Sequence, residues 1–200
     1  MRTIVYLHGF ISSPLSRKAV MLGDYLRQCV SGIHYIVPEM HHRPKRAIEQ
    51  VESTCRGVPV EDLTFVGSSL GGFYATVLAE RLGCRAALLN PAVHPHRHFS
   101  RYLGPQRNLY TGESFVLTQD HVEELRAMDP GAITRPERYW LFVETGDDVL
   151  DYREAVEYYA GAVHEIVRGG DHTLISFPER IPDIVDWAAT DTLPAVASKP

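Results

Sequence analysis

A serine between two glycines, in Gly67-Ser68-Ser69-Leu70-Gly71, joins an apolar strand pattern to an apolar helical pattern. This spacing is typical of a nucleophile elbow, a sharp strand-to-helix turn that lifts a serine hydroxyl clear of the backbone so that a base can take its proton. Glycine two residues before and after the serine avoids collisions with the neighbouring backbone. The pattern predicts that Ser69 is the nucleophile and that Ser68 is not. The alternative is a glycine-rich connection without chemistry.

An acidic residue and a histidine follow two later apolar stretches. Asp147 comes shortly after Tyr139–Val143, and His172 shortly after Val163–Val167. The order serine, aspartate, histidine is that of the catalytic triad in α/β-hydrolases. His172 would take the proton of Ser69 and return it to the leaving group, while the carboxylate fixes the imidazole tautomer. Taken singly, each residue could equally belong to an ordinary turn or helix cap.

Three aspartates compete for the acid position. Thr145-Gly146 provides a turn that lifts the next side chain over the strand end, which favours Asp147. Asp148 would point away from that position. Asp151 lies near the start of the next predicted helix, where a carboxylate can cap the exposed N–H groups. We therefore expect Asp147 to be the acid, with Asp148 and Asp151 as the alternatives.

Attack on an ester carbonyl produces an oxyanion, which needs two fixed N–H donors. The turn supplies one donor from the backbone of Leu70. The second could come from the backbone of Phe10, because His8-Gly9-Phe10 follows the first apolar stretch of the chain. Gly9 would allow a close approach, and we assign it to substrate binding. The His8 side chain is expected to be structural, because His172 already fills the base position.

Apolar stretches alternate with helical patterns along most of the chain, which predicts a mostly parallel sheet with helices on both faces. Functional residues of such sheets lie at the carboxyl ends of the strands. The predicted strands are Thr3–Leu7, Tyr35–Pro38, Leu63–Val66, Ala86–Leu89, Tyr139–Val143 and Val163–Val167. The predicted helices begin near Ser16, at Pro44 and after Ser69, and later ones cover Tyr152–Tyr159 and Pro178–Ala188.

Residues 92–136, which we call the lid, break this alternation and are rich in proline, glycine, histidine and arginine. An irregular insertion of this length is usually functional, and this one leaves the carboxyl end of a strand, so we expect it to cover the site. It holds one predicted helix, Asp120–Met128, with Asp120 as the N-cap and Glu123 three residues later.

The lid carries three alternating histidines, His94, His96 and His98. On one face of an extended segment they could bind a divalent metal, but no carboxylate or thiolate partner is evident in the sequence. We therefore expect no metal, and we assign His94 and His96 to a polar, substrate-binding surface of the lid. The arginines of the same segment are Arg97, Arg101 and Arg107. They could receive an anionic substrate, although a solvated face explains them as well.

The composition limits the class of protein. With 200 residues, 44% hydrophobic and 22% charged, we expect one domain over residues 1–190 and a flexible C-terminal tail over residues 191–200. The net charge of −5 argues against a nucleic-acid partner. The N-terminal apolar run Ile4–Leu7 is too short for a signal peptide or a membrane span, and the three cysteines lack disulfide or metal spacing. We expect a cytoplasmic protein with no membrane partner.

Several motifs between about Arg2 and Trp187 resemble those of one family. They are Tyr6-Leu7-His8-Gly9-Phe10, Ser12-Ser13-Pro14, Gly67-Ser68-Ser69-Leu70-Gly71-Gly72-Phe73-Tyr74-Ala75, Asn90-Pro91-Ala92-Val93, Tyr102-Leu103-Gly104, Thr145-Gly146-Asp147-Asp148-Val149-Leu150-Asp151-Tyr152 and Gly169-Gly170-Asp171-His172. They are similar to the motifs of the YqiA-type bacterial esterases, which are small α/β-hydrolases. The resemblance implies hydrolysis of carboxylic esters or acyl thioesters without a cofactor, with Ser69, Asp147 and His172 at the triad positions. The chain departs from this pattern at His94-Pro95-His96-Arg97-His98.

These observations together predict a serine esterase of the α/β-hydrolase fold that acts on a small-molecule ester through an acyl-enzyme. The first alternative is an acyl-CoA-type thioesterase that uses the same triad. The second is a catalytically silent hydrolase fold that serves as a binding module, for which a damaged triad would be typical.

Overall fold

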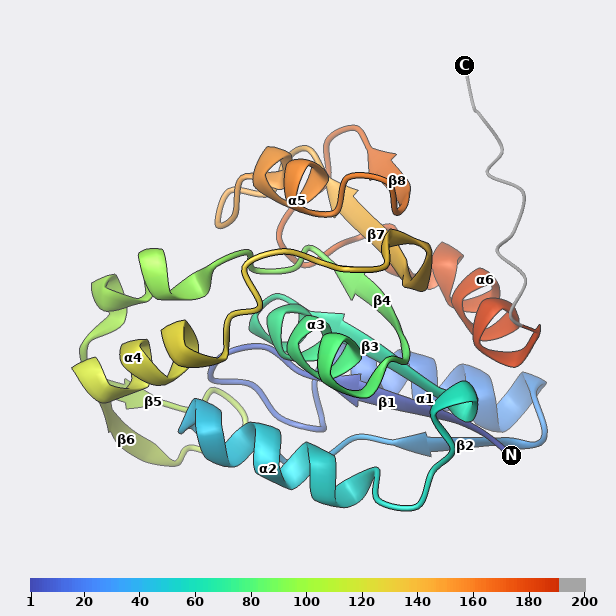
Figure 1. Ribbon diagram of the computed structural model, residues 1–200, viewed down its shortest axis with the longest axis horizontal. Helices are drawn as coiled ribbons and strands as arrows, with labels where there is room; N and C mark the ends of the chain where they lie inside the picture. The colour runs from blue at the N-terminus through green and yellow to red at the C-terminus, as the bar shows by residue number, and fades with distance from the viewer. Residues whose placement is uncertain (191–200) are drawn as a thin grey trace.

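A six-stranded sheet forms the centre of the molecule (Figure 1). The computed structural model describes residues 1–190, and the strand order is β2-β1-β3-β4-β7-β8. The strands are β1 (Arg2–Leu7), β2 (Ile33–Ile36), β3 (Leu63–Ser68), β4 (Arg85–Leu89), β7 (Tyr139–Glu144) and β8 (Val163–Val167). Every pair of neighbours in this sheet is parallel, which confirms the predicted class. The carboxyl ends of β3, β7 and β8 therefore lie at one end of the sheet.

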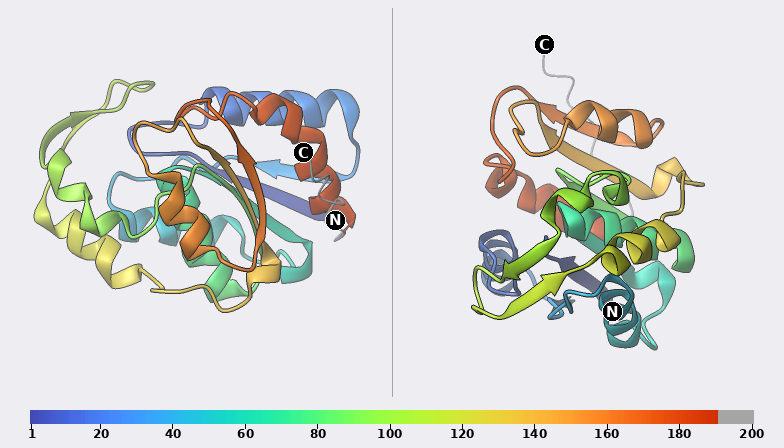
Figure 2. Two further views of the ribbon diagram at one scale, coloured as in Figure 1. Left: turned by 90° about the horizontal axis from the view of Figure 1, so that it is seen from above. Right: turned by 90° about the vertical axis from the view of Figure 1, so that its left-hand side faces the viewer.

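Helices cover both faces of the sheet, which explains why its central strands are apolar on both sides. The helices are α1 (Arg17–Cys29), α2 (Pro44–Thr54), α3 (Leu70–Leu82), α4 (Gln119–Met128), α5 (Tyr152–Tyr158) and α6 (Phe177–Thr190). Ile4 and Tyr6 of β1 pack on the face covered by α1 and α6, whereas Val5 and Leu7 pack on the face covered by α2, α3 and α5. Figure 2 shows the two layers of helices with the sheet between them.

The lid contains more regular structure than the sequence predicts. Besides α4 it holds the 3-10 helices η2 (Pro95–Arg97) and η3 (Phe99–Tyr102), and an antiparallel hairpin of β5 (Gly104–Arg107) and β6 (Ser114–Leu117). These elements extend from one end of the sheet (Figure 2). The side chains of β5 are exposed or only partly buried, so this strand lacks the apolar pattern by which a strand is recognised.

The start of α4 differs from the prediction. Thr118, and not Asp120, is the N-cap, and His121 occupies the position that glutamate or glutamine usually takes in a capping box. The Thr118 backbone N–H donates to His121 Nδ1 at 3.1 Å. Asp120 lies instead in the first turn, where its charge suits the helix dipole. Glu123 accepts a bond from the Gln119 side chain at 2.8 Å.

The second strand also lies earlier than predicted. β2 pairs with β1 from Ile33 to Ile36, whereas the sequence pattern favours Tyr35–Pro38. Pro38 has no N–H to donate, so the strand cannot extend through it.

Cys55 and Cys84 are buried, and Cys29 is exposed. Among residues 1–190, none of the helices combines the length and apolar character that crossing a membrane requires. The predicted tail lies outside the described residues.

Candidate active site

Ser69 forms the whole of the turn between β3 and α3. Its backbone has φ 56° and ψ −121°, a combination that residues other than glycine rarely adopt. A side chain on Gly67 would collide with the Gly71 carbonyl, and one on Gly71 would collide with the Leu7 carbonyl. The turn is fixed by the Ser69 N–H, which donates to Leu89 O at 3.1 Å. The tight approach of these backbones explains the predicted pair of glycines.

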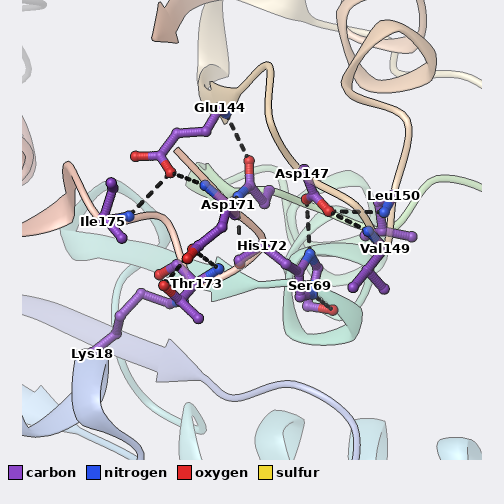
Figure 3. Close-up of polar contacts among 11 residues, drawn as sticks. Lys18, Ser69, Glu144, Asp147, Val149, Leu150, Asp171, His172, Thr173 and Ile175 are labelled. Atoms are coloured by element: carbon purple, nitrogen blue, oxygen red, sulfur yellow. Dashed lines mark hydrogen bonds and ion pairs between the residues drawn. The ribbon is translucent and has the colours of Figure 1, made fainter. Parts of the chain in front are cut away.

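The structure brings Ser69, His172 and Asp147 into one line of hydrogen bonds (Figure 3). His172 Nε2 lies 3.1 Å from Ser69 Oγ, and His172 Nδ1 lies 2.7 Å from Asp147 Oδ2. Since a carboxylate can only accept, Nδ1 carries the proton that is donated to Asp147. In the neutral ring Nε2 is then the acceptor that faces the Ser69 hydroxyl.

Asp147 is held by the backbone as well as by the imidazole. Its Oδ1 accepts the N–H groups of Val149 and Leu150, each at 2.9 Å, and its side chain is 1% exposed. Burial alone would raise the pKa of this carboxyl, but the bonds from His172, Leu150 and Val149 outweigh burial and hold the pKa below its usual value. Asp147 is therefore an ionised carboxylate in a fixed orientation at neutral pH.

The two other aspartates occupy different positions. Asp148 is exposed, and Asp151 is the N-cap of α5, where its side chain accepts the Arg153 backbone N–H at 3.0 Å. Arg153 also forms an exposed ion pair with Asp151. Of the three, Asp147 is the aspartate hydrogen-bonded to His172.

Gly9, which precedes the predicted oxyanion donor Phe10, lies close to Ser69. A methyl group on Gly9 would lie 3.8 Å from Ser69 Oγ and 3.4 Å from Ser68 O, so the Gly9 backbone lies against the turn. Phe10 and Leu70 both line the pocket above the serine. His8 is 4% exposed, and its Nδ1 donates to the Gly9 carbonyl at 3.1 Å. Burial lowers the pKa of His8, which keeps this ring neutral.

A pocket of about 860 Å³ opens at Ser69 and His172. Its walls come from the segment after β1, from α1, from the lid and from the segment after β8. The apolar part of the lining includes Phe10, Met21, Leu70, Val93, Phe99, Tyr102, Leu109, Leu150, Leu174 and Phe177. Arg17, Lys18 and Arg101 also line the pocket, and Glu154 is the one carboxylate that lines it in the described part of the chain. Of the lid arginines named from the sequence, Arg101 lines the pocket, and Arg97 and Arg107 are not among the lining residues.

His94 and His96 are not among the residues that line this pocket, although their neighbours Pro95 and His98 are. Both rings approach the Asp129 carboxylate. The Nδ1 atom of His94 lies 2.7 Å from Asp129 Oδ2, and the Nδ1 atom of His96 lies 3.1 Å from it. Asp129 is the residue that follows α4, and its side chain is 6% exposed. The contact between His94 and Asp129 therefore joins the start of η2 to the end of α4. The sequence showed no carboxylate partner because Asp129 lies 35 residues after His94. Within residues 1–190, no three His, Cys, Asp or Glu side chains are grouped so as to hold a metal ion.

Two buried polar residues near the triad were not predicted from the sequence. Glu144, the last residue of β7, is 0% exposed, and Asn90, which follows β4, is 3% exposed. Both bind the backbone of the segment that carries His172 (residues 168–176, the His172 loop). A sequence signal for Glu144 does exist, since a single carboxylate ends a strand that is otherwise apolar, but its partners lie far along the chain.

The sequence matches the profile of an uncharacterised protein family, UPF0227, over residues 3–189. This chain belongs to the UPF0227 family. It is 28% identical over 96 residues to a UPF0227 protein of Serratia proteamaculans (strain 568), a match that covers 48% of this chain and 53% of that protein. It is 30% identical over 98 residues to one from Yersinia pseudotuberculosis serotype O:1b, covering 48% and 54%. These matches span about half the length of the curated relatives.

Solved structures show the fold of this UPF0227 member. The alpha/beta hydrolase domain-containing protein 10 from mouse superimposes with a TM-score of 0.72 at 15% identity, covering 95% of this chain and 90% of that one. Est1E from Butyrivibrio proteoclasticus gives a TM-score of 0.66 at 14% identity, covering 94% and 88%. The α/β-hydrolase fold predicted from the sequence is confirmed, and the chain carries the family resemblance that its motifs indicated.

Proposed function

We propose that this protein is a serine esterase that hydrolyses carboxylic esters through an acyl-enzyme intermediate. The observation that carries the proposal is the pair of distances at His172, 3.1 Å to the Ser69 hydroxyl and 2.7 Å to the Asp147 carboxylate, with Ser69 and His172 in the lining of a largely apolar pocket. Acyl transfer needs three parts, and the site has each of them: a serine in a strained turn, a base whose unprotonated nitrogen faces the serine hydroxyl, and a buried ionised acid.

In the acylation step, His172 Nε2 takes the proton of Ser69 as Oγ attacks the carbonyl carbon of the ester. The Asp147 carboxylate stabilises the imidazolium that forms, and its bond to Nδ1 keeps the ring in the required tautomer. The tetrahedral intermediate collapses when the carbon–oxygen bond to the alcohol breaks. His172 gives its proton to the leaving alkoxide, and the acyl group remains on Ser69.

The backbone N–H groups of Phe10 and Leu70 would bind the oxyanion of this intermediate. Each such donor typically stabilises the transition state by about 3 kcal/mol. In the second half-reaction, His172 takes a proton from water, the hydroxide attacks the acyl carbon, and the proton returns to Ser69 Oγ as the carboxylic acid leaves. The cycle restores every group and needs no cofactor or metal.

A thioester is the second candidate substrate, and the cations of the pocket favour it. Among residues 1–190, Arg17, Lys18 and Arg101 line the pocket together with one carboxylate, Glu154, although the whole chain carries a net charge of −5. A phosphate-bearing leaving group would suit that excess of positive charge.

Among the similar structures, one is of the carboxylesterase CesB from Bacillus subtilis, at 16% identity and a TM-score of 0.57. Another is of Est1E from Butyrivibrio proteoclasticus with ferulic acid bound.

Covalent labelling tests the proposal directly. A fluorophosphonate should attach to the purified protein at one site, Ser69, and the label should be lost in Ser69→Ala but kept in Ser68→Ala. A panel of esters and thioesters with matched acyl groups then separates the two substrate classes. A wild-type protein that takes up no label and hydrolyses neither class would refute a serine hydrolase and leave the silent binding module.

A further inference from the structure

His172 lies in a loop whose backbone makes most of its hydrogen bonds to the rest of the protein. The His172 loop runs from β8 to α6 and contains Gly169 and Gly170, both with positive φ. A side chain on Gly170 would collide with the Glu144 carboxylate. The two glycines therefore allow the loop backbone to close around that carboxylate.

Glu144 binds three backbone donors of the loop. Its Oε2 accepts the N–H groups of Asp171 at 2.8 Å and Ile175 at 3.1 Å, and its Oε1 accepts the N–H of Ser176 at 2.8 Å. These donors lie on both sides of His172 in the sequence, so one carboxylate fixes both arms of the loop. Figure 3 shows Glu144 on the opposite side of the loop from the Ser69 hydroxyl.

Asn90 binds two backbone carbonyl groups of the same loop. Its Nδ2 donates to Asp171 O at 3.0 Å and to His172 O at 3.4 Å, while its Oδ1 accepts the Glu144 backbone N–H at 3.0 Å. Asn90 has φ 41°, which asparagine tolerates better than most residues. Lys18 adds a bond from Nζ to Thr173 O at 2.8 Å. The backbone on either side of His172 is therefore tied to the sheet and to α1.

We propose that Glu144, supported by Asn90, is a positioning residue that holds the His172 imidazole in line between Asp147 and Ser69. This inference rests on the proposed function, and it adds to the triad a second buried carboxylate that does not touch the substrate. The imidazole must meet Asp147 at one nitrogen and Ser69 at the other, and the loop bound by Glu144 sets both approaches.

The carboxylate acts in its ionised form. Burial alone would raise the pKa of Glu144, but the bonds from Ser176, Asp171 and Ile175 outweigh burial and lower it below the usual value. Glutamine has nearly the same shape but only one accepting oxygen. If that oxygen keeps Asp171 and Ile175, the amide NH2 group faces the Ser176 N–H, and two donors then oppose each other. The loop must shift to relieve this contact.

Glu144→Gln tests the inference, with Glu80→Gln as the matched control. Glu80 also accepts a backbone N–H, from Thr134 at 3.1 Å, and it accepts the hydroxyl of Tyr139, but no bond joins it to the His172 loop. For Glu144→Gln we expect kcat to fall about 10²-fold, the size of effect that a misplacement of about 1 Å produces, with KM changed little. Glu80→Gln should lower thermal stability and leave kcat near the wild-type value.

A spectroscopic readout separates positioning from general destabilisation. The His172 Nδ1 proton, bonded to Asp147, should give a low-field proton resonance in the wild type and in Glu80→Gln. In Glu144→Gln this resonance should broaden through exchange with water while the remaining spectrum stays that of a folded protein. If Glu144→Gln does not fold, Asn90→Gly tests the same loop, because glycine accepts the positive φ and removes only the side-chain bonds.

The outcomes are distinct. A folded Glu144→Gln with kcat within about threefold of wild type and an intact low-field resonance overturns the inference. Loss of kcat in Glu80→Gln to the same extent as in Glu144→Gln also overturns it, since the effect would then follow stability alone. A wild-type protein without esterase activity and without labelling of Ser69 would refute the proposed function instead.

Discussion

Replacement of Asp147 by asparagine is the sharpest test of the triad, because the structure fixes how the new amide must sit. Asp147 Oδ1 accepts two backbone N–H groups, from Val149 and Leu150. An asparagine oxygen in that place keeps both bonds and directs the NH2 group at His172 Nδ1. The imidazole must then accept at Nδ1 and carry its proton on Nε2, where it can no longer take the proton of Ser69.

The size of the loss follows from the cost of turning the amide round. The reversed amide restores the productive tautomer but places NH2 against the two backbone donors. Each bond lost in this way costs about 1–3 kcal/mol, so reversal costs about 2–6 kcal/mol. At about 1.4 kcal/mol per factor of ten, the productive form is then populated at about one part in 30 to one part in 10⁴. We expect kcat/KM of Asp147→Asn to fall about 10³-fold, within the loss of about 10⁴-fold known for serine proteases.

The assay compares three variants on one short-chain ester at neutral pH. Asp148→Asn should stay within about threefold of wild type because that side chain is exposed, and Asp151→Asn should mainly lower stability because it caps α5. Near-native turnover in Asp147→Asn together with a crippled Asp148→Asn would refute the assignment of the acid. Fluorophosphonate labelling of Ser69 should slow in parallel with kcat/KM, since it needs the same deprotonation.

Two further predictions concern stability. Ser69→Gly should be more stable than Ser69→Ala by about 1 kcal/mol, because relief of about 1–3 kcal/mol of backbone strain exceeds the 0.4–1 kcal/mol or so of glycine entropy. Its Tm should be higher by about 2–4 °C in a thermal melt, and an equal or lower Tm would show that the turn is unstrained. Burial lowers the pKa of Lys18 to about 8, so between about pH 8 and 10.5 the unfolded chain holds a proton that the folded chain has released, and Lys18 makes stability rise with pH in that window. Urea unfolding should therefore show that the stability of Lys18→Met relative to wild type falls from about pH 7 to about pH 10, and a constant difference would contradict the assigned shift.

The parts of the site that were predictable are those whose chemistry is local in the sequence. The elbow is a contiguous turn, and the backbone collisions that require Gly67 and Gly71 occur within it and with the neighbouring β1. Parallel strands bring their carboxyl ends together, so residues that follow β7 and β8 could be expected near Ser69 without knowledge of the loops. The choice of Asp147 followed from the Thr145-Gly146 turn, and the hydrogen bond to His172 agrees with that choice.

The features that sequence reasoning missed depend on contacts between distant segments. The bonds of Glu144 to the His172 loop span 27 to 32 residues, and the bond of Lys18 to Thr173 spans 155. No periodic pattern records such pairs. The expectation for His94 and His96 considered only their neighbours in the chain, whereas the packing of η2 against α4 brings Asp129 to them. The capping residue of α4 was misplaced because histidine is an unusual partner in a capping box.

The three triad residues differ in how firmly the sheet encloses them. β3 and β7, which lead to Ser69 and Asp147, are internal strands and are buried throughout. Among residues 1–190, β8 pairs on one side only, and it is partly buried. Edge segments open at a lower free energy than the core unfolds. If β8 opened together with the His172 loop, which would have to break its bonds to Glu144 and Asn90, His172 would leave the site while the nucleophile and the acid stayed in place, and the result would be a folded but inactive species. On heating, turnover would then be lost at a lower temperature than the one at which the core unfolds, and it would return when the edge closes, without refolding of the core. Activity would therefore measure the local stability of the sheet edge and not the stability of the whole domain.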